Sequence, residues 1–504
     1  MRRFVFLRLL LLLWHVTTSS ALPPIEVHGY KFFDNNTGEE FVVRGIDYYP
    51  RPNYGDLNHN SLDLFSNQYR HIWERDVVYL QNLKVNVVRL YAVNASQNHD
   101  DFMHAMEKAG IYVIVALAHD CPTCAITRDA VPDCYPPELK LQGQRVIRAF
   151  RQYNNTLAFS AGNEVNHFAP PNQPEWNAPC QKKFIRDMRK YMVACPGRHI
   201  PIGLVSADNE RENLAQYYNC YEQDDYDRAE WYGINTYVSC DGAAKTYSDA
   251  PGFKLLEESF ARLNYSIPVL LTEFGCLSDS FPTIDGYEGQ RNFLQGKWLL
   301  EEPSLREQFS GGIAFEYSIE RENAGQYPFK TFNKQGYGVG YFSPELCDDI
   351  NVTCEYNPMP SYKALRNVYA ESQNVTTIRI EDFQIAASRS GSSHCPTRFD
   401  RIDSFVWKAD QTPDLVCAAE DETSASIGHQ QSVIARETGF TKLSGGNVAL
   451  VVSSLLILGI GVYYKRWRHE TPITSNNGDE DAGPDDSVPF LSLQGFKDNY
   501  NSIA

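Results

Sequence analysis

Short apolar runs alternate with amphipathic stretches along the first three quarters of the chain. Eight runs have the length and the aliphatic and aromatic content of buried strands; they are residues 41–49, 85–93, 111–119, 157–165, 200–208, 231–238, 268–276 and 311–318. The stretches between them, such as WERDVVYLQNLK and FKLLEESFARLN, have apolar residues at helical spacing. Apolar strands that alternate with helices indicate a parallel sheet covered on both faces. Eight such repeats predict an α/β protein with a (β/α)8 TIM barrel over residues 22–370.

The two ends of the chain have different patterns. Two arginines, an apolar run and the small residues TTSSA form the layout of a secretory signal peptide, which we expect over residues 1–21. Residues 445–464 are uncharged and long enough to cross a bilayer as one transmembrane helix, and KRWRH follows at once. A core helix or a removable lipid-anchor signal fits less well, because forty polar residues follow. The basic cluster predicts a type I membrane protein, with the barrel outside the cell or in a lumen.

Two polar segments flank the expected transmembrane helix. Residues 371–444 are polar and rich in Ser and Thr, and we expect them to form a stalk. Residues 465–504 are acidic and have no apolar periodicity, which is typical of a disordered cytoplasmic tail. The net charge of −17 argues against nucleic acid as a partner.

Twelve cysteines indicate disulfides if the barrel lies in an oxidising compartment. Cys121, Cys124 and Cys134 form a CPTC motif plus one cysteine, which suggests part of a zinc site. The second CxxC pair or the histidines at the usual spacing are missing, so disulfides are favoured and no metal is expected. Glycosylation sequons, which fit a secreted glycoprotein, begin at Asn35, Asn94, Asn154, Asn264, Asn351 and Asn374.

Two glutamates stand at the ends of predicted strands. Glu164 follows Asn163 in LAFSAGNEV, and Glu273 lies near the end of PVLLTEFGC. A carboxylate is costly to bury without a partner, and a barrel brings the ends of its strands to one cleft. A pair of carboxylates across a cleft is what glycosidic bond cleavage requires, and a separation of about 5 Å indicates a retaining mechanism. The alternative is that each glutamate is a surface or structural acid.

Other strand ends carry residues that suit this chemistry. Arg89 can hold Glu273 ionised, because an opposite charge favours the charged form. Tyr237, in GINTY, can donate a hydrogen bond to the same carboxylate. Three further tyrosines can present ring faces to sugars, with packing as the alternative for each; they are Tyr48, Tyr91 and Tyr317.

Seven motifs together resemble glycoside hydrolase family 72, the β-1,3-glucanosyltransferases. They are RGIDYYP (44–50), VVRLYAVN (87–94), YNNTLAFSAGNEVNHF (153–168), LVSADNERENLAQYYNC (204–220), WYGINTYVSC (231–240), PVLLTEFGC (268–276) and FSGGIAFEYS (309–318). GNE and TEFG recur in other barrel glycosidases. GINTY with a following cysteine, EFGC, and FSGG-x-x-x-EYS in this order are more specific, and the resemblance covers about residues 25 to 370.

The resemblance implies a role for each strand-end residue. Glu164 is implied as the general acid/base, Glu273 as the nucleophile, and Asn163 as the residue that binds the sugar 2-hydroxyl. The family cleaves inside a β-1,3-glucan chain, holds the new reducing end as a glycosyl-enzyme, and passes it to a second glucan chain. The expected partners are therefore donor and acceptor glucan chains. No cofactor is expected, because two carboxylates suffice for this chemistry.

Three disulfides are expected. Likeness to the family implies two of them, Cys240 with Cys276 and Cys220 with Cys347. We infer the third, Cys180 with Cys195, from the proximity of these two residues along the chain.

The chain departs from the family pattern in three places. Tyr49 stands where the family usually has a glutamine. In the family, this glutamine contacts the donor sugar. The loop 118–136 carries three extra cysteines, and the segment 371–444 has too few cysteines for the family's carbohydrate-binding module. Three functions remain open: a retaining transglycosylase, a β-glucan hydrolase on the same site, and a non-catalytic glucan receptor. The presence of both carboxylates favours an enzyme.

Overall fold

The computed structural model describes residues 21–50, 62–119, 121, 123–221, 223–240, 242–277, 291–319, 336–347, 349, 351–391 and 394–417. The expected transmembrane helix, the cytoplasmic tail and all but the last residue of the signal peptide lie outside these ranges. Within these ranges, no helix combines the length and the apolar character that a membrane crossing needs.

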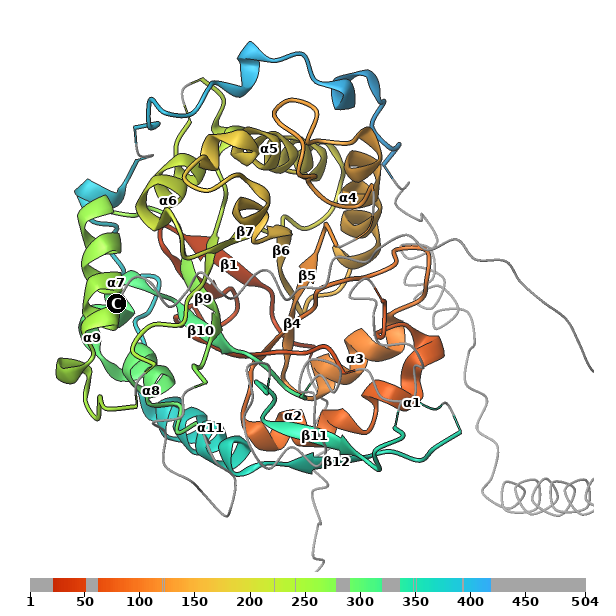
Figure 1. The fold of residues 1–504 in the computed structure, drawn as a ribbon, viewed down its shortest axis with the longest axis vertical. Helices are drawn as coiled ribbons and strands as arrows, with labels where there is room; N and C mark the ends of the chain where they lie inside the picture. Colours follow the sequence, from red (N-terminus) through yellow and green to blue (C-terminus); the bar gives the residue numbers. More distant parts are fainter. Residues whose placement is uncertain are drawn as a thin grey trace, which may run out of the picture. The chain divides into compact units, whose positions relative to one another are not determined.

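Eight parallel strands close into a barrel (Figure 1). They are β3 (Val43–Asp47), β4 (Val87–Arg89), β5 (Tyr112–Ala116), β6 (Thr156–Asn163), β7 (Ile202–Ala207), β8 (Tyr232–Asn235), β9 (Val269–Phe274) and β10 (Gly311–Ala314). Neighbours in sequence are neighbours in the barrel, and β10 pairs with both β9 and β3. Every strand lies within its predicted run or begins one residue before it, so the prediction of a (β/α)8 barrel is confirmed.

Helices cover the outside of the barrel (Figure 1). They are α1 (Arg70–Trp73), α2 (Asp76–Leu83), α3 (Asp100–Lys108), α4 (Pro137–Phe150), α5 (Ala178–Ala194), α6 (Arg211–Asn219), α7 (Pro251–Leu263), α8 (Leu294–Glu301), α9 (Pro303–Gln308) and α11 (Pro360–Glu371). Four of them begin at a proline, whose fixed φ suits the first helical position. Two antiparallel hairpins add to the barrel, β1 (Ile25–His28) with β2 (Lys31–Asp34) and β11 (Gly340–Ser343) with β12 (Glu355–Pro358).

A glycine allows the last strand to close the barrel. Gly311 begins β10, has a φ of 106°, and pairs with Val43 of β3. A Cβ atom at this position would lie 2.1 Å from the carbonyl oxygen of Val43. A side chain would therefore clash with the first strand as well as strain the backbone.

Residues 376–417, here called the C-terminal strap, pack against the barrel domain. In Figure 1 the later part of the strap is the blue segment that runs along α5 and α4. Arg389 is 5% exposed, and its Nε donates to the carbonyl oxygen of Tyr265 over 2.6 Å. Lys140 of α4 donates to the carbonyl oxygen of Thr412 over 2.7 Å. The compact domain therefore extends to Cys417, beyond the boundary at residue 370 and into the expected stalk.

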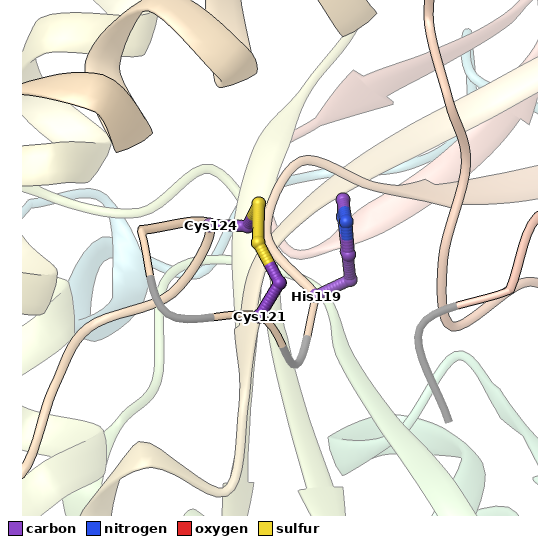
Figure 2. A group of neighbouring side chains, drawn as sticks. All are labelled: His119, Cys121 and Cys124. Carbon is purple, nitrogen blue, oxygen red and sulfur yellow. A yellow bond between two sulfur atoms is a disulfide. The ribbon is translucent and has the colours of Figure 1, made fainter. Parts of the chain in front are cut away.

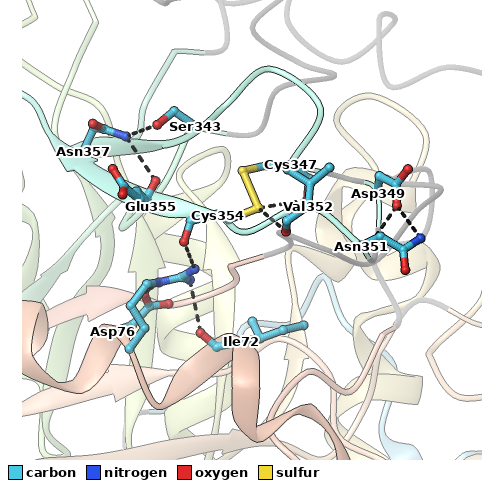
Figure 3. The surroundings of a disulfide bond; sticks show 11 residues. Ile72, Asp76, Ser343, Cys347, Asp349, Asn351, Val352, Cys354, Glu355 and Asn357 are labelled. Carbon is cyan, nitrogen blue, oxygen red and sulfur yellow. Dashed lines mark hydrogen bonds and ion pairs between the residues drawn. A yellow bond between two sulfur atoms is a disulfide. The ribbon is translucent and has the colours of Figure 1, made fainter. Parts of the chain in front are cut away.

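All twelve cysteines form disulfides. The pairs are Cys121–Cys124 (Figure 2), Cys134–Cys180, Cys195–Cys417, Cys220–Cys395, Cys240–Cys276 and Cys347–Cys354 (Figure 3). The pairing of Cys240 with Cys276 is confirmed. The pairing of Cys220 with Cys347 is wrong, because Cys347 closes the connection between β11 and β12 with Cys354, and Cys220 holds the strap through Cys395.

The expected pairing of Cys180 with Cys195 is also wrong, for a geometric reason. Cys180 lies in the first turn of α5 and Cys195 directly follows its last residue. Fifteen helical residues span about 22 Å, whereas a disulfide needs Cα atoms within about 7 Å. Cys180 instead pairs with Cys134, and Cys195 pairs with Cys417 of the strap.

Removing the disulfide at the end of the strap should destabilise the domain. Cys195 and Cys417 are 222 residues apart, so this disulfide closes the longest loop of the six. We expect replacement of both cysteines by serine to lower the free energy of unfolding by about 2–5 kcal/mol and the melting temperature with it. The matched control replaces Cys121 and Cys124, which are only 3 residues apart, and should lower the melting temperature less. Equal thermal denaturation curves for the two double variants would contradict this role of the strap.

Candidate active site

The carboxyl ends of four strands bring three predicted residues and Asn235 to one place. Arg89 ends β4, Asn163 ends β6, Asn235 ends β8, and Glu273 is the last residue but one of β9. Arg89 and Glu273 are 184 residues apart in sequence, yet their side chains are hydrogen-bonded. These residues therefore lie at the end of the barrel where TIM-barrel proteins bind their ligands.

The guanidinium of Arg89 connects three side chains from three other strands. Its Nη1 lies 2.9 Å from Asp47 Oδ1 and 3.3 Å from Glu273 Oε1, and its Nη2 lies 2.7 Å from Asn163 Oδ1. The arginine is 2% exposed and stays protonated, so it is a permanent buried cation between two carboxylates. It fixes the amide of Asn163 relative to the carboxylate of Glu273.

Glu273 is buried and held at both carboxylate oxygens. Tyr91 donates to Oε1 and Tyr237 donates to Oε2, each over 2.8 Å. Burial and the nearby charge of Glu164 raise the pKa of Glu273. Arg89 and the two tyrosine hydroxyls act against this rise, because they bind the ionised form. The hydrogen bond expected from Tyr237 and the ion pair expected from Arg89 are both present.

Glu164 has a more open environment. Its backbone is left-handed, with a φ of 51°, and its side chain is 27% exposed. Asn235 Nδ2 donates to Oε1 over 2.9 Å, and His167 Nδ1 lies 3.1 Å from Oε2. Burial acts to raise the pKa of Glu164, but His167 and Asn235 outweigh it and lower this pKa below its usual value.

The charge of Glu164 acts on Glu273. The charge of Glu164 is one of the causes that raise the pKa of Glu273, so ionisation of one carboxyl disfavours ionisation of the other. Protonation of one carboxyl consequently favours the charged form of its partner.

Two amides bridge the carboxyl groups. Asn235 Nδ2 donates to Asn163 Oδ1 over 3.2 Å as well as to Glu164, and Asn235 Oδ1 accepts from Thr272. Asn163 Oδ1 thus accepts from both Arg89 and Asn235, which orients its Nδ2 outward. The Asn163 side chain is exposed, and within the described residues its Nδ2 makes no hydrogen bond. This amide N–H is free to donate to a ligand hydroxyl.

The three tyrosines expected to face sugars have other roles. Tyr91 binds Glu273, and the Arg89 guanidinium lies over its ring at 4.4 Å. Tyr48 and Tyr317 are fully buried. Tyr48 donates to Asp76 over 2.9 Å, and Tyr317 stacks on Tyr356 of β12 with ring centroids 4.3 Å apart. The expected sugar contact is wrong for Tyr48 and Tyr317, because Tyr317 packs on the β11–β12 hairpin and Tyr48 packs on Phe65 and Tyr317.

Sequence analysis did not identify three polar residues of the site. Asn235 stands directly before Thr236 and Tyr237 in GINTY, so its position at a strand end was a usable signal. His167 follows Glu164 by three residues, which places the two side chains together in one helical turn. Asp47 ends β3 and is 1% exposed, and its sequence context alone gives no sign of its contact with Arg89.

The tyrosine hydroxyls allow a matched test. We expect Tyr237→Phe to lower kcat/KM roughly tenfold to a hundredfold, because a hydrogen bond to a charged group contributes about 1.5–3 kcal/mol. Tyr48→Phe removes a buried donor from Asp76 and should cost about 1–3 kcal/mol of stability while leaving kcat/KM unchanged. Turnover assays and thermal denaturation separate the two effects. A similar loss of turnover in both variants would argue against a direct role of Tyr237 at Glu273.

Comparison with known proteins relates this chain to one family. The family described as Glucanosyltransferase, glycoside hydrolase family 72, matches residues 14–336. The 1,3-beta-glucanosyltransferase PGA4 of Candida albicans is 33% identical over 319 residues, which cover 62% of this chain and 64% of that protein. The 1,3-beta-glucanosyltransferase gas5 of Schizosaccharomyces pombe is 34% identical over 360 residues, or 71% of this chain and 62% of that protein. The matched region thus spans less than two thirds of either relative.

Solved structures agree with these matches. Gas2p of Saccharomyces cerevisiae in complex with laminaripentaose has a TM-score of 0.58 and 26% identity, covering 81% of this chain and 79% of that one. The same protein in complex with laminaritriose and laminaritetraose has a TM-score of 0.57 at the same identity and coverage. The barrel, the order of its motifs and these matches together show that the chain belongs to glycoside hydrolase family 72.

Proposed function

We propose that this chain is a retaining β-1,3-glucanosyltransferase, which cleaves a β-1,3-glucan chain internally and transfers the cut end to a second chain. The observation that carries the proposal is the carboxylate of Glu273, held at both oxygens by Arg89, Tyr91 and Tyr237 beside the half-exposed Glu164. Relatives named 1,3-beta-glucanosyltransferases and Gas2p structures with laminari-oligosaccharides support the choice of substrate.

In this proposal Glu273 is the nucleophile. Its fixed orientation suits attack on the anomeric carbon, because a positioned carboxylate loses little freedom on reaching the transition state. A bond forms between a Glu273 oxygen and this carbon while the bond to the leaving glycosidic oxygen breaks. The step requires the ionised form of Glu273, and the three donors oppose the rise in its pKa that burial and the charge of Glu164 cause.

Glu164 is the general acid and then the general base. In the first step its carboxyl proton goes to the leaving oxygen, and in the second step its carboxylate takes the proton of the incoming hydroxyl. When Glu164 is protonated it carries no charge, so the pKa of Glu273 is lower than it is when Glu164 is ionised. Asn163 Nδ2, which Arg89 and Asn235 orient, donates to the sugar 2-hydroxyl next to the cleaved bond.

Transfer and hydrolysis share every step except the last. A glucan hydroxyl that accepts the glycosyl group gives transfer, and water in its place gives hydrolysis. A β-glucan hydrolase on the same site is therefore the second candidate function, and a non-catalytic glucan receptor is the third. The hydrogen bonds that hold both carboxyl groups favour the two enzymes over the receptor.

The proposal extends to the location of the enzyme. Six disulfides that use all twelve cysteines suit an oxidising compartment, so the catalytic domain is proposed to lie outside the cell or in a lumen. The uncharged residues 445–464 would anchor it as a single-pass type I protein. Protease treatment of sealed membrane vesicles tests this topology. The catalytic domain and the tail residues 465–504 should be accessible to protease from opposite sides of the membrane.

Incubation of the purified protein with reduced laminari-oligosaccharides tests transfer directly. We expect products longer than the donor, whereas only shorter products indicate hydrolysis and no turnover despite binding indicates a receptor. Glu273→Gln and Glu164→Gln should each lower turnover by at least about 10³-fold, because each removes a group that takes part in bond making or proton transfer. The control is Glu355→Gln on β12, an exposed glutamate whose loss should leave turnover unchanged. Substantial turnover in Glu273→Gln would contradict its role as the nucleophile.

The pH profile tests the contact between His167 and Glu164. The active pair carries one proton, so activity falls at low pH when both carboxyls are protonated and at high pH when both are ionised. His167 lowers the pKa of Glu164, so His167→Gln should raise it and allow the pair to keep its last proton to higher pH. We therefore expect the alkaline limb of the kcat/KM profile to move to higher pH. The control is His104→Gln, an exposed histidine of α3, and an unmoved alkaline limb in His167→Gln would contradict the coupling.

A further inference from the structure

The loop that follows β5 gathers three potential metal ligands. His119, Cys121 and Cys124 lie together in Figure 2, and one ligand atom from each lies within 4.8 Å of the other two. The two sulfurs are joined in a disulfide. This is the one group of three or more His, Cys, Asp or Glu side chains with such spacing within the described residues.

The Cys121–Cys124 disulfide differs from the other five in exposure and in loop size. Both of its cysteines are half-buried, whereas each of the other disulfides has at least one buried cysteine. Its cysteines are 3 residues apart, and the separations in the other pairs range from 7 to 222. A thiol reductant reaches exposed sulfurs first, and a disulfide that closes a very short loop stabilises the fold least. This disulfide is therefore the one that opens most readily without unfolding the barrel.

Backbone hydrogen bonds hold the three ligands together independently of the disulfide. The N–H of His119 donates to the carbonyl oxygen of Cys124 over 3.0 Å, and the N–H of Cys124 donates to that of Cys121 over 3.1 Å. Neither bond involves a sulfur, so both remain when the disulfide is reduced. The Cys-x-x-Cys spacing and the neighbouring imidazole match the ligand types that zinc prefers.

We propose that His119, Cys121 and Cys124 form a redox-gated zinc site. Two molecules of a thiol reductant supply two electrons and two protons, which convert the disulfide to two thiols and the reductant to its own disulfide. Zn²⁺ then displaces one proton from each thiol and binds two thiolates and the imidazole. In the oxidised protein neither sulfur is a thiolate, so the ion does not bind. Three protein ligands leave a fourth position for water or a solute.

The place of the loop in the fold adds an implication. β5 pairs with β4, which ends in Arg89, and with β6, which ends in Asn163. The proposed site therefore lies on the loop after β5, and both strands next to β5 contribute residues to the candidate active site.

Metal content measured on the full-length protein tests the site. The protein is treated with a mild thiol reductant or left oxidised, incubated with zinc chloride and passed through a desalting column. We expect about one retained zinc ion per chain after reduction and none before it. Cobalt in place of zinc should give the visible bands of tetrahedral thiolate coordination. Mapping of newly alkylated cysteines should identify Cys121 and Cys124.

Three variants make the test specific. Cys121→Ser combined with Cys124→Ser should abolish zinc retention, and His119→Gln should weaken it, while His104→Gln on α3 should bind zinc as the unchanged protein does. Circular dichroism verifies that each variant is folded. The proposal is overturned if the reduced protein retains no zinc, if the double serine variant retains as much zinc as the parent, or if reduction first opens a different disulfide.

Discussion

The guanidinium of Arg89 is a buried cation whose partners come from three other strands of the barrel. Burial of such a charge is favourable only when nearby carboxylates compensate it, and Asp47 and Glu273 do so at 2.9 and 3.3 Å. Its third partner, Asn163, accepts from the nitrogen that faces away from them. Because β3, β6 and β9 each supply one partner, the geometry of the site depends on the closure of the whole barrel. The proposed chemistry therefore requires a complete fold rather than a local motif.

The parts of the fold that sequence could predict follow from local rules. The eight strands were found because a strand buried on both faces must be apolar along its whole length. The disulfide pairs are harder to predict from the sequence, because the pairing of two cysteines depends on their distance in space. Cys180 and Cys195 are near in sequence, but α5 separates them. The polar composition of the strap favours a stalk, whereas its attachment through Arg389 and Cys417 joins residues far apart in the sequence.

In the candidate site, too, local sequence predicts some features and not others. Glu164 and Glu273 could be predicted because a carboxylate at the end of an apolar strand is costly unless it has a function. Tyr48 and Tyr317 were assigned to sugars because they also stand at strand ends. Sequence gives the position of a side chain along a strand, but the neighbouring elements decide which way it points. The β11–β12 hairpin buries Tyr317 under Tyr356, and no local sequence pattern predicts that contact.

The left-handed backbone of Glu164 has an energetic cost. A non-glycine residue in this conformation costs the fold on the order of 1 kcal/mol, and such outliers persist where function requires them. Its backbone N–H is bound to the carbonyl oxygen of Val205 on β7, which fixes the main chain at this point. Glycine would adopt the same backbone without steric cost. Glycine would therefore relieve the strain at this position, but it would remove the carboxyl group that the proposed proton transfer needs.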